Sequence, residues 1–262
     1  MSLSSVYSDR TDVAVLPFPR PAILTLAAAG DMGASGGGMN DARAVQLNAH
    51  HIQELVMVRQ EHTRDILVLD EHPRSEDSAD RGPNHATGQT AGLYVLGTAD
   101  GVICNGSNSH GLWLGVTVAD CVPVFLTAGA HGPCALLHSG RKGTGILLTA
   151  LRMMQSRYGI EAAELDVMIG PAIGVCCYQV GEECAEAFAA EWGAPAVKRW
   201  PDGPHLDLPH LNQELALGYG VKRVHVVERC TRCDKELGSY RREGPDNYTR
   251  MLALLQVGNN TL

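Results

Sequence analysis

Short apolar segments separated by polar ones recur along this chain, and they predict a core built mainly of β-strands. Each segment is too short for a buried helix, is rich in Val, Leu, Ile or Ala, and is followed by a polar residue or glycine. The predicted strands lie at residues 22–29, 56–59, 66–69, 112–119, 134–137, 165–169 and 221–227.

Apolar residues at helical spacing predict four helices between these strands. Asn40 is a suitable N-cap for a helix that continues to about residue 55, and Gly159 is a suitable end for a second helix. The second, third and fourth helices are predicted at residues 144–158, 182–192 and 208–219, the last followed by Gly220. Paired strands together with strands joined by helices predict an α+β fold, with a mixed β-sheet core covered by helices.

The length and composition favour one globular domain. The 262 residues are 45% hydrophobic and 19% charged, which is enough apolar material for a sizeable core. We expect a single domain over residues 1–262, with a loose N-terminal segment at 1–20. The polar stretch at 70–92 is predicted to be a long surface loop and a candidate lid. The glycine-rich stretch at 31–38 matches no phosphate-binding fingerprint, so a plain loop is expected.

The charge and the cysteines narrow the classes of function. A formal net charge of -8 argues against binding to nucleic acid or to an anionic membrane, and no apolar run reaches the roughly 20 residues that span a bilayer. A small-molecule substrate is the favoured partner. The cysteines lie mostly in apolar segments, which is typical of reduced thiols and predicts a cytoplasmic protein. They are Cys104, Cys121, Cys134, Cys176, Cys177, Cys184, Cys230 and Cys233.

Cys121 and His138 are the main candidates for chemistry, because each follows a predicted strand. Either alone is more often a buried structural residue, but together they suggest a metal pair or a catalytic dyad. A catalytic zinc site typically has three protein ligands, and His62 is a candidate for the third because it follows the strand at 56–59. Arg141 and Lys142 open the next helix and predict an anion pocket.

Asp120 is a candidate for general acid–base work or for orienting the metal site, since it precedes Cys121. On a regular strand the two side chains would point in opposite directions, so this role needs an irregular backbone at Asp120. An N-cap or ion-pair role is the alternative. Cys230 and Cys233 form a C-x-x-C pair with no evident second pair of ligands, and we expect a structural role for them and for the adjacent Cys176 and Cys177.

Four ordered motifs resemble the YfiH or laccase-domain family, whose members are named polyphenol oxidases and purine nucleoside phosphorylases. They read Thr117-Val-Ala-Asp-Cys-Val-Pro-Val, Leu137-His-Ser-Gly-Arg-Lys-Gly-Thr, Ile169-Gly-Pro-Ala-Ile-Gly-Val-Cys-Cys-Tyr-Gln-Val-Gly and Ser239-Tyr-Arg-Arg-Glu-Gly. The resemblance spans roughly residues 22–257. It implies a zinc site formed by His62, Cys121 and His138, and an enzyme that cleaves purine nucleosides with phosphate and deaminates adenosine.

The resemblance also implies substrate contacts, and this chain departs from the family's motifs at some of those positions. Gln60 belongs to the Gln-x-His motif, and Arg241 and Arg242 belong to a Ser-Tyr-Arg-Arg motif that could bind phosphate or ribose oxygens or form surface ion pairs. Arg141-Lys142 stands where the family has Trp-Arg, so Lys142 offers phosphate a point charge in place of a bidentate guanidinium. The family's N-terminal Thr-Arg-x-Gly-Gly-Val-Ser is represented only by residues 26–33.

Three alternatives to this function stay open. A copper-binding polyphenol oxidase is suggested by the older family name, but the chain has no His-x-His pair of the kind multicopper sites use, although copper could occupy the zinc site. A cysteine hydrolase or amidase would use Cys121 as nucleophile and His138 as base, for example in editing peptidoglycan precursors. A nucleotide-responsive binding protein without turnover is the third.

Overall fold

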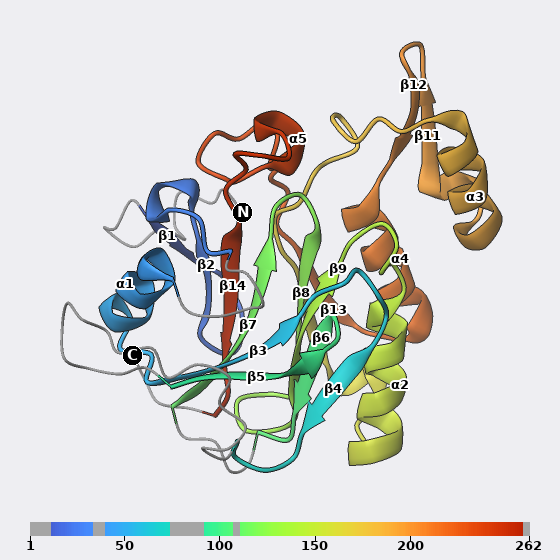
Figure 1. The fold of residues 1–262 in the computed structure, drawn as a ribbon. Coiled ribbons are helices and arrows are strands. Elements are labelled where there is room, and N and C mark those ends of the chain that lie inside the picture. The colour runs from blue at the N-terminus through green and yellow to red at the C-terminus, as the bar shows by residue number, and fades with distance from the viewer. Residues whose placement is uncertain (1–11, 34–39, 74–91, 107–110, 259–262) are drawn as a thin grey trace.

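Two six-stranded β-sheets packed face to face form the centre of the molecule (Figure 1). The computed structural model describes residues 12–33, 40–73, 92–106 and 111–258. The strands are β1 (Val13–Val15), β2 (Ala22–Thr25), β3 (Glu54–Arg59), β4 (Ile66–Leu69), β5 (Gly92–Thr98), β6 (Gly101–Cys104), β7 (Leu112–Val118), β8 (Val122–Thr127), β9 (Cys134–Ser139), β10 (Asp166–Ile169), β11 (Val197–Trp200), β12 (Gly203–Leu206), β13 (Arg223–Val226) and β14 (Met251–Gln256). The helices are α1 (Asp41–Ala49), α2 (Ile146–Tyr158), α3 (Glu182–Trp192), α4 (Leu208–Tyr219) and α5 (Tyr240–Glu243), with short 3-10 helices η2 (Ala27–Ala29), η5 (Ala162–Glu164) and η6 (Ala194–Ala196).

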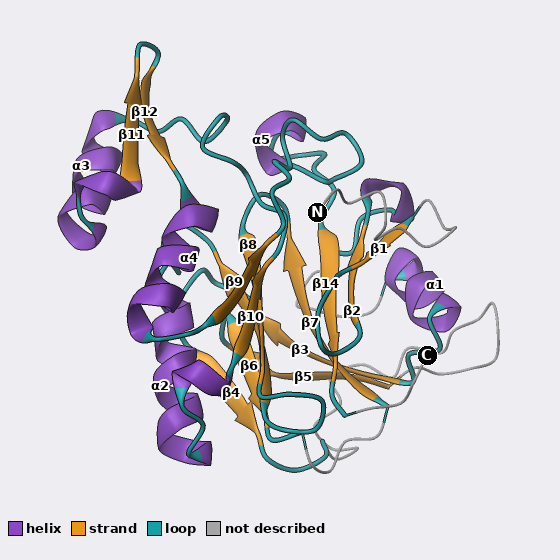
Figure 2. Ribbon diagram, turned by 180° about the vertical axis from the view of Figure 1, so that it is seen from behind, coloured by secondary structure: helices purple, strands orange, loops and turns teal. Residues whose placement is uncertain are grey.

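Both sheets are mixed. The strand order is β1-β2-β14-β7-β3-β5 in the first sheet and β13-β10-β8-β9-β6-β4 in the second. In the first sheet β3 is parallel to β5 and β7, and in the second β10 is parallel to β13 and β4 to β6, while the other pairs are antiparallel. A separate hairpin of β11 and β12 extends beside α3, away from the sheets (Figure 2).

The alternation of side chains along each strand explains the layers. In β3, Val56 and Val58 belong to the core between the two sheets, whereas Leu55 and Met57 belong to a second core that includes Leu47 of α1. A third core joins the outer face of the second sheet to α2 and α4. Helices therefore cover the outer faces of both sheets, with α1 on one side and α2 and α4 on the other (Figure 2).

Several predicted elements agree with the structure and several need correction. The helices at 182–192 and 208–219 have the predicted bounds. The first helix ends at Ala49, not near residue 55, because the chain turns at His51, whose φ is +54°, and Leu55 already lies in β3. The segment at 1–20 is not loose throughout, since Val13–Val15 pair with β2; residues 1–11 lie outside the described part.

Further corrections concern strands that the sequence patterns did not reveal. β5, β6, β8, β14 and the β11–β12 hairpin were not predicted, and the strand expected at 22–29 ends at Thr25, where η2 follows. Most of the predicted loop at 70–92 and of the glycine-rich stretch at 31–38 lies outside the described residues. Within those residues, no helix has the length and apolar character needed to cross a membrane.

Candidate metal and substrate site

Strand register brings Cys121 and His138 together. Cys121 directly precedes β8, and β8 pairs with β9 so that Pro123 lies opposite His138. His138 is therefore inside β9, one residue before its end, and not after the strand as the sequence suggested. His62 arrives from the turn after β3, with its ring centroid 4.8 Å from that of His138. The ligand atoms of His62, Cys121 and His138 all lie within 4.8 Å of one another.

Asp100 fixes the geometry of this group without belonging to it. Its buried carboxylate accepts a hydrogen bond from Nδ1 of His138 at 2.8 Å, which leaves Nε2 of that ring available to a ligand. The same carboxylate accepts the backbone N–H groups of Glu61, His62 and Thr63 at 3.2, 3.0 and 2.6 Å, and the Thr63 hydroxyl at 2.9 Å. One side chain thus positions both histidines.

The charged forms of Cys121, His138 and Asp100 stabilise one another. Burial acts to raise the pKa of Cys121, but the charge of His138 and hydrogen bonds from His138 and His62 lower it to about 6. Burial acts to lower the pKa of His138, but Cys121 and Asp100 raise it to about 9. Burial likewise acts to raise the pKa of Asp100, and hydrogen bonds from His138 and Thr63 lower it to about 2. In the metal-free protein these shifts favour a thiolate beside an imidazolium.

The donor set fits a zinc ion. One thiolate and two imidazoles are suitable ligands for a borderline-soft cation, and three protein ligands leave a position for water or substrate. The hydrogen bond from His138 to Asp100 is the kind of contact that fixes the tautomer of a ligating histidine. The same donors are also compatible with copper, so the chemistry of the set does not by itself select one metal.

Asp120 has the irregular backbone that its predicted role requires. Its φ is +81°, in the left-handed region, so Asp120 and Cys121 do not alternate as they would on a regular strand. Both carboxylate oxygens are occupied: one accepts the Thr231 hydroxyl at 2.6 Å and the other accepts the backbone N–H of Arg241 at 2.6 Å. Asp120 thus connects the candidate metal-ligand group to the loop before α5 and to α5 itself.

The three candidate ligands lie in the wall of a cavity of about 650 Å³, a size suited to a small organic molecule. Four arginines and three tyrosines contribute to its lining, namely Arg43, Arg59, Arg241, Arg250, Tyr178, Tyr240 and Tyr248. The Arg241 guanidinium lies over the Tyr178 ring at 5.3 Å, and Arg250 is paired with Asp31 at 2.7 Å. Burial raises the pKa of Tyr178 to about 12, so its hydroxyl remains a hydrogen-bond donor at neutral pH.

Of the predicted substrate contacts, some line the cavity and others lie outside its lining. Gln60 lines the cavity, but its amide is engaged with Thr117, accepting from the backbone N–H and donating to the carbonyl at 2.8 Å each. Arg241 lines the cavity. Lys142 is exposed and is not among the lining residues. Arg242 is also outside the lining, and its guanidinium bonds to backbone carbonyls of the preceding loop.

Sequence reasoning missed several residues of the site. Asp100 follows β5, a strand that the sequence patterns did not reveal, so its position at a strand end went unrecognised. Arg59 was predicted only as the last residue of a strand, although a charged residue that ends an apolar run next to Gln60 and His62 was an available signal. Tyr178 stands in the motif that begins at Ile169, which was an available signal, whereas no local pattern marks Tyr248.

Comparisons with known proteins agree with the motifs. A family model described as "Multi-copper polyphenol oxidoreductase laccase" matches residues 34–258. The purine nucleoside phosphorylase YlmD of Geobacillus stearothermophilus is 30% identical over 224 residues, which cover 82% of this chain and 77% of that protein. The adenosine deaminase RL5, from an unknown prokaryotic organism, is 31% identical over 204 residues, covering 74% and 72%.

The fold comparison gives the same result. The crystal structure of YlmD from Geobacillus stearothermophilus superposes with a TM-score of 0.79 at 25% identity, covering 97% of this chain and 98% of that one. The predicted α+β class, with mixed sheets and helices, is thereby confirmed.

Proposed function

The chain belongs to the laccase-like YfiH family, and from that premise we propose that it is a zinc-dependent enzyme that cleaves purine nucleosides with phosphate and deaminates adenosine at the same site. One observation carries the proposal. The group of His62, Cys121 and His138 opens into a cavity of about 650 Å³ that also contains arginine and tyrosine side chains. Relatives named for both activities support it.

Each part of the cavity has a role in this proposal. A bound zinc ion would polarise the substrate or activate water. Arg59 and Arg241 supply positive charge for the oxygens of phosphate, and the tyrosine rings offer flat apolar surface for a purine. Asp100 keeps His138 in the tautomer that presents Nε2.

Proton transfer at the purine needs a group that is free to exchange a proton. Glu61 and Asp120 are the carboxylates in the cavity lining. Asp120 already accepts two short hydrogen bonds, so we assign it to positioning Arg241. The Glu61 side chain has no hydrogen bond or ion pair with any described residue, and it directly precedes the ligand His62. We therefore assign proton transfer to Glu61.

The test is a direct assay of the purified protein together with its metal content. Adenosine and inosine are incubated with and without phosphate, free base is separated chromatographically, and ammonia is followed in parallel. We expect phosphate-dependent base release and ammonia from adenosine, both lost with the metal in Cys121→Ala and His138→Ala. Cys184→Ser, on α3 and outside the cavity lining, is the matched control. Full metal content without base release or ammonia would refute the proposal.

A cysteine hydrolase is the second candidate, favoured by the chain of contacts from Cys121 to His138 to Asp100. A thiolate with its pKa lowered to about 6, beside an imidazole held by a buried carboxylate, is the arrangement of a nucleophile, a base and an orienting group. The two proposed functions predict different reactivity of the Cys121 thiol in the purified protein. A metal-bound Cys121 resists alkylation by iodoacetamide until a chelator is added, whereas a free nucleophile is alkylated at once and loses its activity.

The oxidase named in the family description lacks a comparable observation. Multicopper chemistry uses several closely spaced imidazoles. Within the described residues, the groups that could hold a metal are the His/Cys/His set and a set of four cysteines, and neither has that composition.

A further inference from the structure

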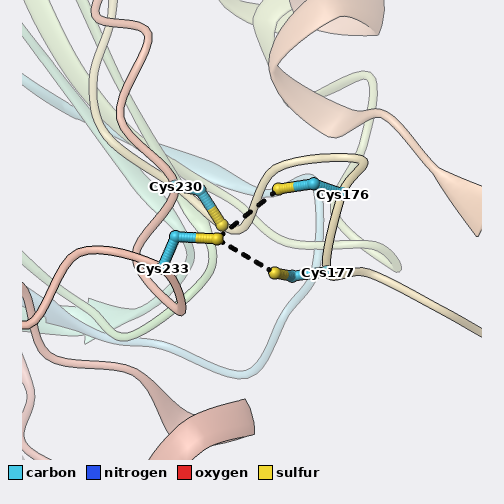
Figure 3. A group of neighbouring side chains, drawn as sticks. All are labelled: Cys176, Cys177, Cys230 and Cys233. Atoms are coloured by element: carbon cyan, nitrogen blue, oxygen red, sulfur yellow. Dashed lines mark hydrogen bonds between the residues drawn. The ribbon is translucent and has the colours of Figure 1, made fainter.

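Four cysteines from two distant segments of the chain lie close together. Two are in the turn just before Tyr178, and two are in the segment that follows β13. Their sulfur atoms point toward one another (Figure 3). All four Sγ atoms lie within 4.8 Å of each other, with Cys233 at 3.3 Å from Cys177 and 3.8 Å from Cys176. We refer to Cys176, Cys177, Cys230 and Cys233 as the cysteine cluster.

The spacing of these sulfurs matches a single tetrahedral ion. Zinc–thiolate bonds of about 2.3 Å in a tetrahedron place the sulfurs about 3.8 Å apart, close to the separations observed. A disulfide needs sulfurs about 2.05 Å apart, and all four cysteines are free thiols in the structure. We propose that the cysteine cluster is a second metal site, a structural zinc site distinct from the His/Cys/His group.

Two contacts would stabilise thiolates at Cys230 and Cys177. The backbone N–H of Gly174 donates to Cys230 Sγ at 3.3 Å, and the Arg232 guanidinium lies 3.6 Å from Cys177 Sγ. Four thiolates and one zinc ion carry a net charge of about -2, which Arg232 partly offsets. Gly174 approaches so closely that a Cβ there would lie 3.3 Å from Cys176 Sγ and 3.5 Å from Cys230 Sγ. The backbone therefore closes over one side of the cluster.

The two segments of the cluster are joined by backbone contacts that lead to the cavity. Ala172 and Cys230 form an isolated parallel bridge, and the Thr231 N–H donates to the Ala172 carbonyl at 3.0 Å. The Thr231 hydroxyl and the Ile173 N–H both donate to Asp120, at 2.6 and 2.9 Å. A metal ion in the cluster would thus fix the segment that holds Asp120 beside the cavity.

This arrangement corrects the sequence-based view of the C-x-x-C pair. Cys230 and Cys233 looked isolated because their partners lie more than 50 residues earlier in the chain. The fold supplies the missing pair from Cys176 and Cys177. The cysteines keep the structural role that the sequence predicted, and we attribute that role to a metal ion bound by all four residues.

Metal stoichiometry of the full chain tests the proposal. Protein produced with zinc is analysed by native mass spectrometry and by elemental analysis. We expect two ions in the wild type, one in Cys121→Ala, one in Cys233→Ser and none in the double variant. Cys184→Ser should keep two. Cys233 is exposed, so its replacement should leave the chain folded, which circular dichroism checks.

A second measurement separates the two sites by their ligands. Cobalt bound to Cys121→Ala should show the strong near-ultraviolet thiolate charge-transfer bands of a four-sulfur site, and cobalt bound to Cys233→Ser much weaker ones. Loss of the cluster's ion should lower Tm by about 5 °C or more. The proposal is overturned if Cys121→Ala binds no metal, or if non-reducing alkylation and mass analysis show a disulfide among the four cysteines. Neither outcome depends on nucleoside cleavage.

Discussion

At the residue scale, Asp100 controls the site through hydrogen bonds alone. Asp100→Asn keeps the shape of the side chain but replaces one carboxylate oxygen with an NH2 group, so the single remaining oxygen cannot serve both His138, which donates to Oδ1, and Thr63, which donates to Oδ2. We expect metal affinity to fall by roughly 10- to 100-fold. Competition with a chelator of known affinity measures the change, and Asp202→Asn on the distant β11–β12 hairpin is the control. An unchanged affinity would contradict the role given to Asp100.

The ionisation of Cys121 gives a prediction with a definite sign. A pKa lowered to about 6 means that the thiolate persists down to mildly acidic pH, so alkylation of metal-free protein at Cys121 should rise with a midpoint near pH 6. Peptide mass spectrometry after timed iodoacetamide labelling measures it. His138→Gln removes the cationic partner and should move the midpoint upward. A midpoint near pH 9 in the wild type would show that His138 does not stabilise the thiolate.

Glu61 and Asp120 are distinguished by which kinetic constant responds. Glu61→Gln should lower kcat by roughly 10²- to 10⁴-fold and leave the metal bound, because it removes the exchangeable proton. Asp120→Asn should mainly raise KM, because it weakens the contact that positions Arg241. Steady-state kinetics with the metal content measured on each variant decide the matter. A collapse of kcat in Asp120→Asn, with Glu61→Gln fully active, would reverse the two assignments.

At the scale of elements, the sequence pattern predicted a helix or strand correctly where residue spacing and end signals agreed within that element. The helices α3 and α4 could be predicted from spacing and from the glycines that follow them. The end of α1 could not, because the apolar run at 55–58 continues the helical spacing and only the turn at His51 separates it from the helix. β8 was hidden because Pro123 interrupts its apolar run, although the proline is tolerated opposite His138.

The loop before α5 depends on Arg242, which gives a prediction about stability. Its guanidinium donates to the carbonyls of Thr231 and Leu237 and pairs with Glu243. Arg242→Lys cannot reach these acceptors together, so we expect the free energy of unfolding to fall by about 2 kcal/mol or more. Urea denaturation measures it, with the exposed Arg152→Lys of α2 as control. A large rise in phosphate KM at unchanged stability would instead support Arg242 as a substrate contact.

At the scale of the whole molecule, the site exists only because two sheets bring distant segments to one place. The motifs predicted Cys121 and His138 as a pair, and His62 was named as a third candidate from its place after the strand at 56–59, which the family resemblance also implied. Nothing local could predict that Asp100 lies under His138, since this depends on the pairing of β6 with β9. The cysteine cluster was unpredictable for the same reason: the bridge between Ala172 and Cys230 is a long-range contact.

The charge of the whole chain sets a condition on phosphate binding. A net charge of -8 repels phosphate, so binding must rely on the local cations of the cavity. Arg59 is exposed to the cavity and has no ion pair with any described residue, unlike Arg250, which pairs with Asp31. Arg59→Gln should therefore raise the phosphate KM by roughly 10- to 100-fold, the value of a charge-assisted hydrogen bond.

Lys142→Gln is the informative comparison for Arg59→Gln, because it removes the same charge from a residue outside the cavity lining. Its phosphate KM should change by less than about threefold and should approach the wild-type value as salt screens long-range attraction. Phosphate titrations of both variants at low and high ionic strength measure the two contributions. If Lys142→Gln has the larger effect at high salt, the anion site lies at the start of α2, as the sequence first indicated, and not at Arg59.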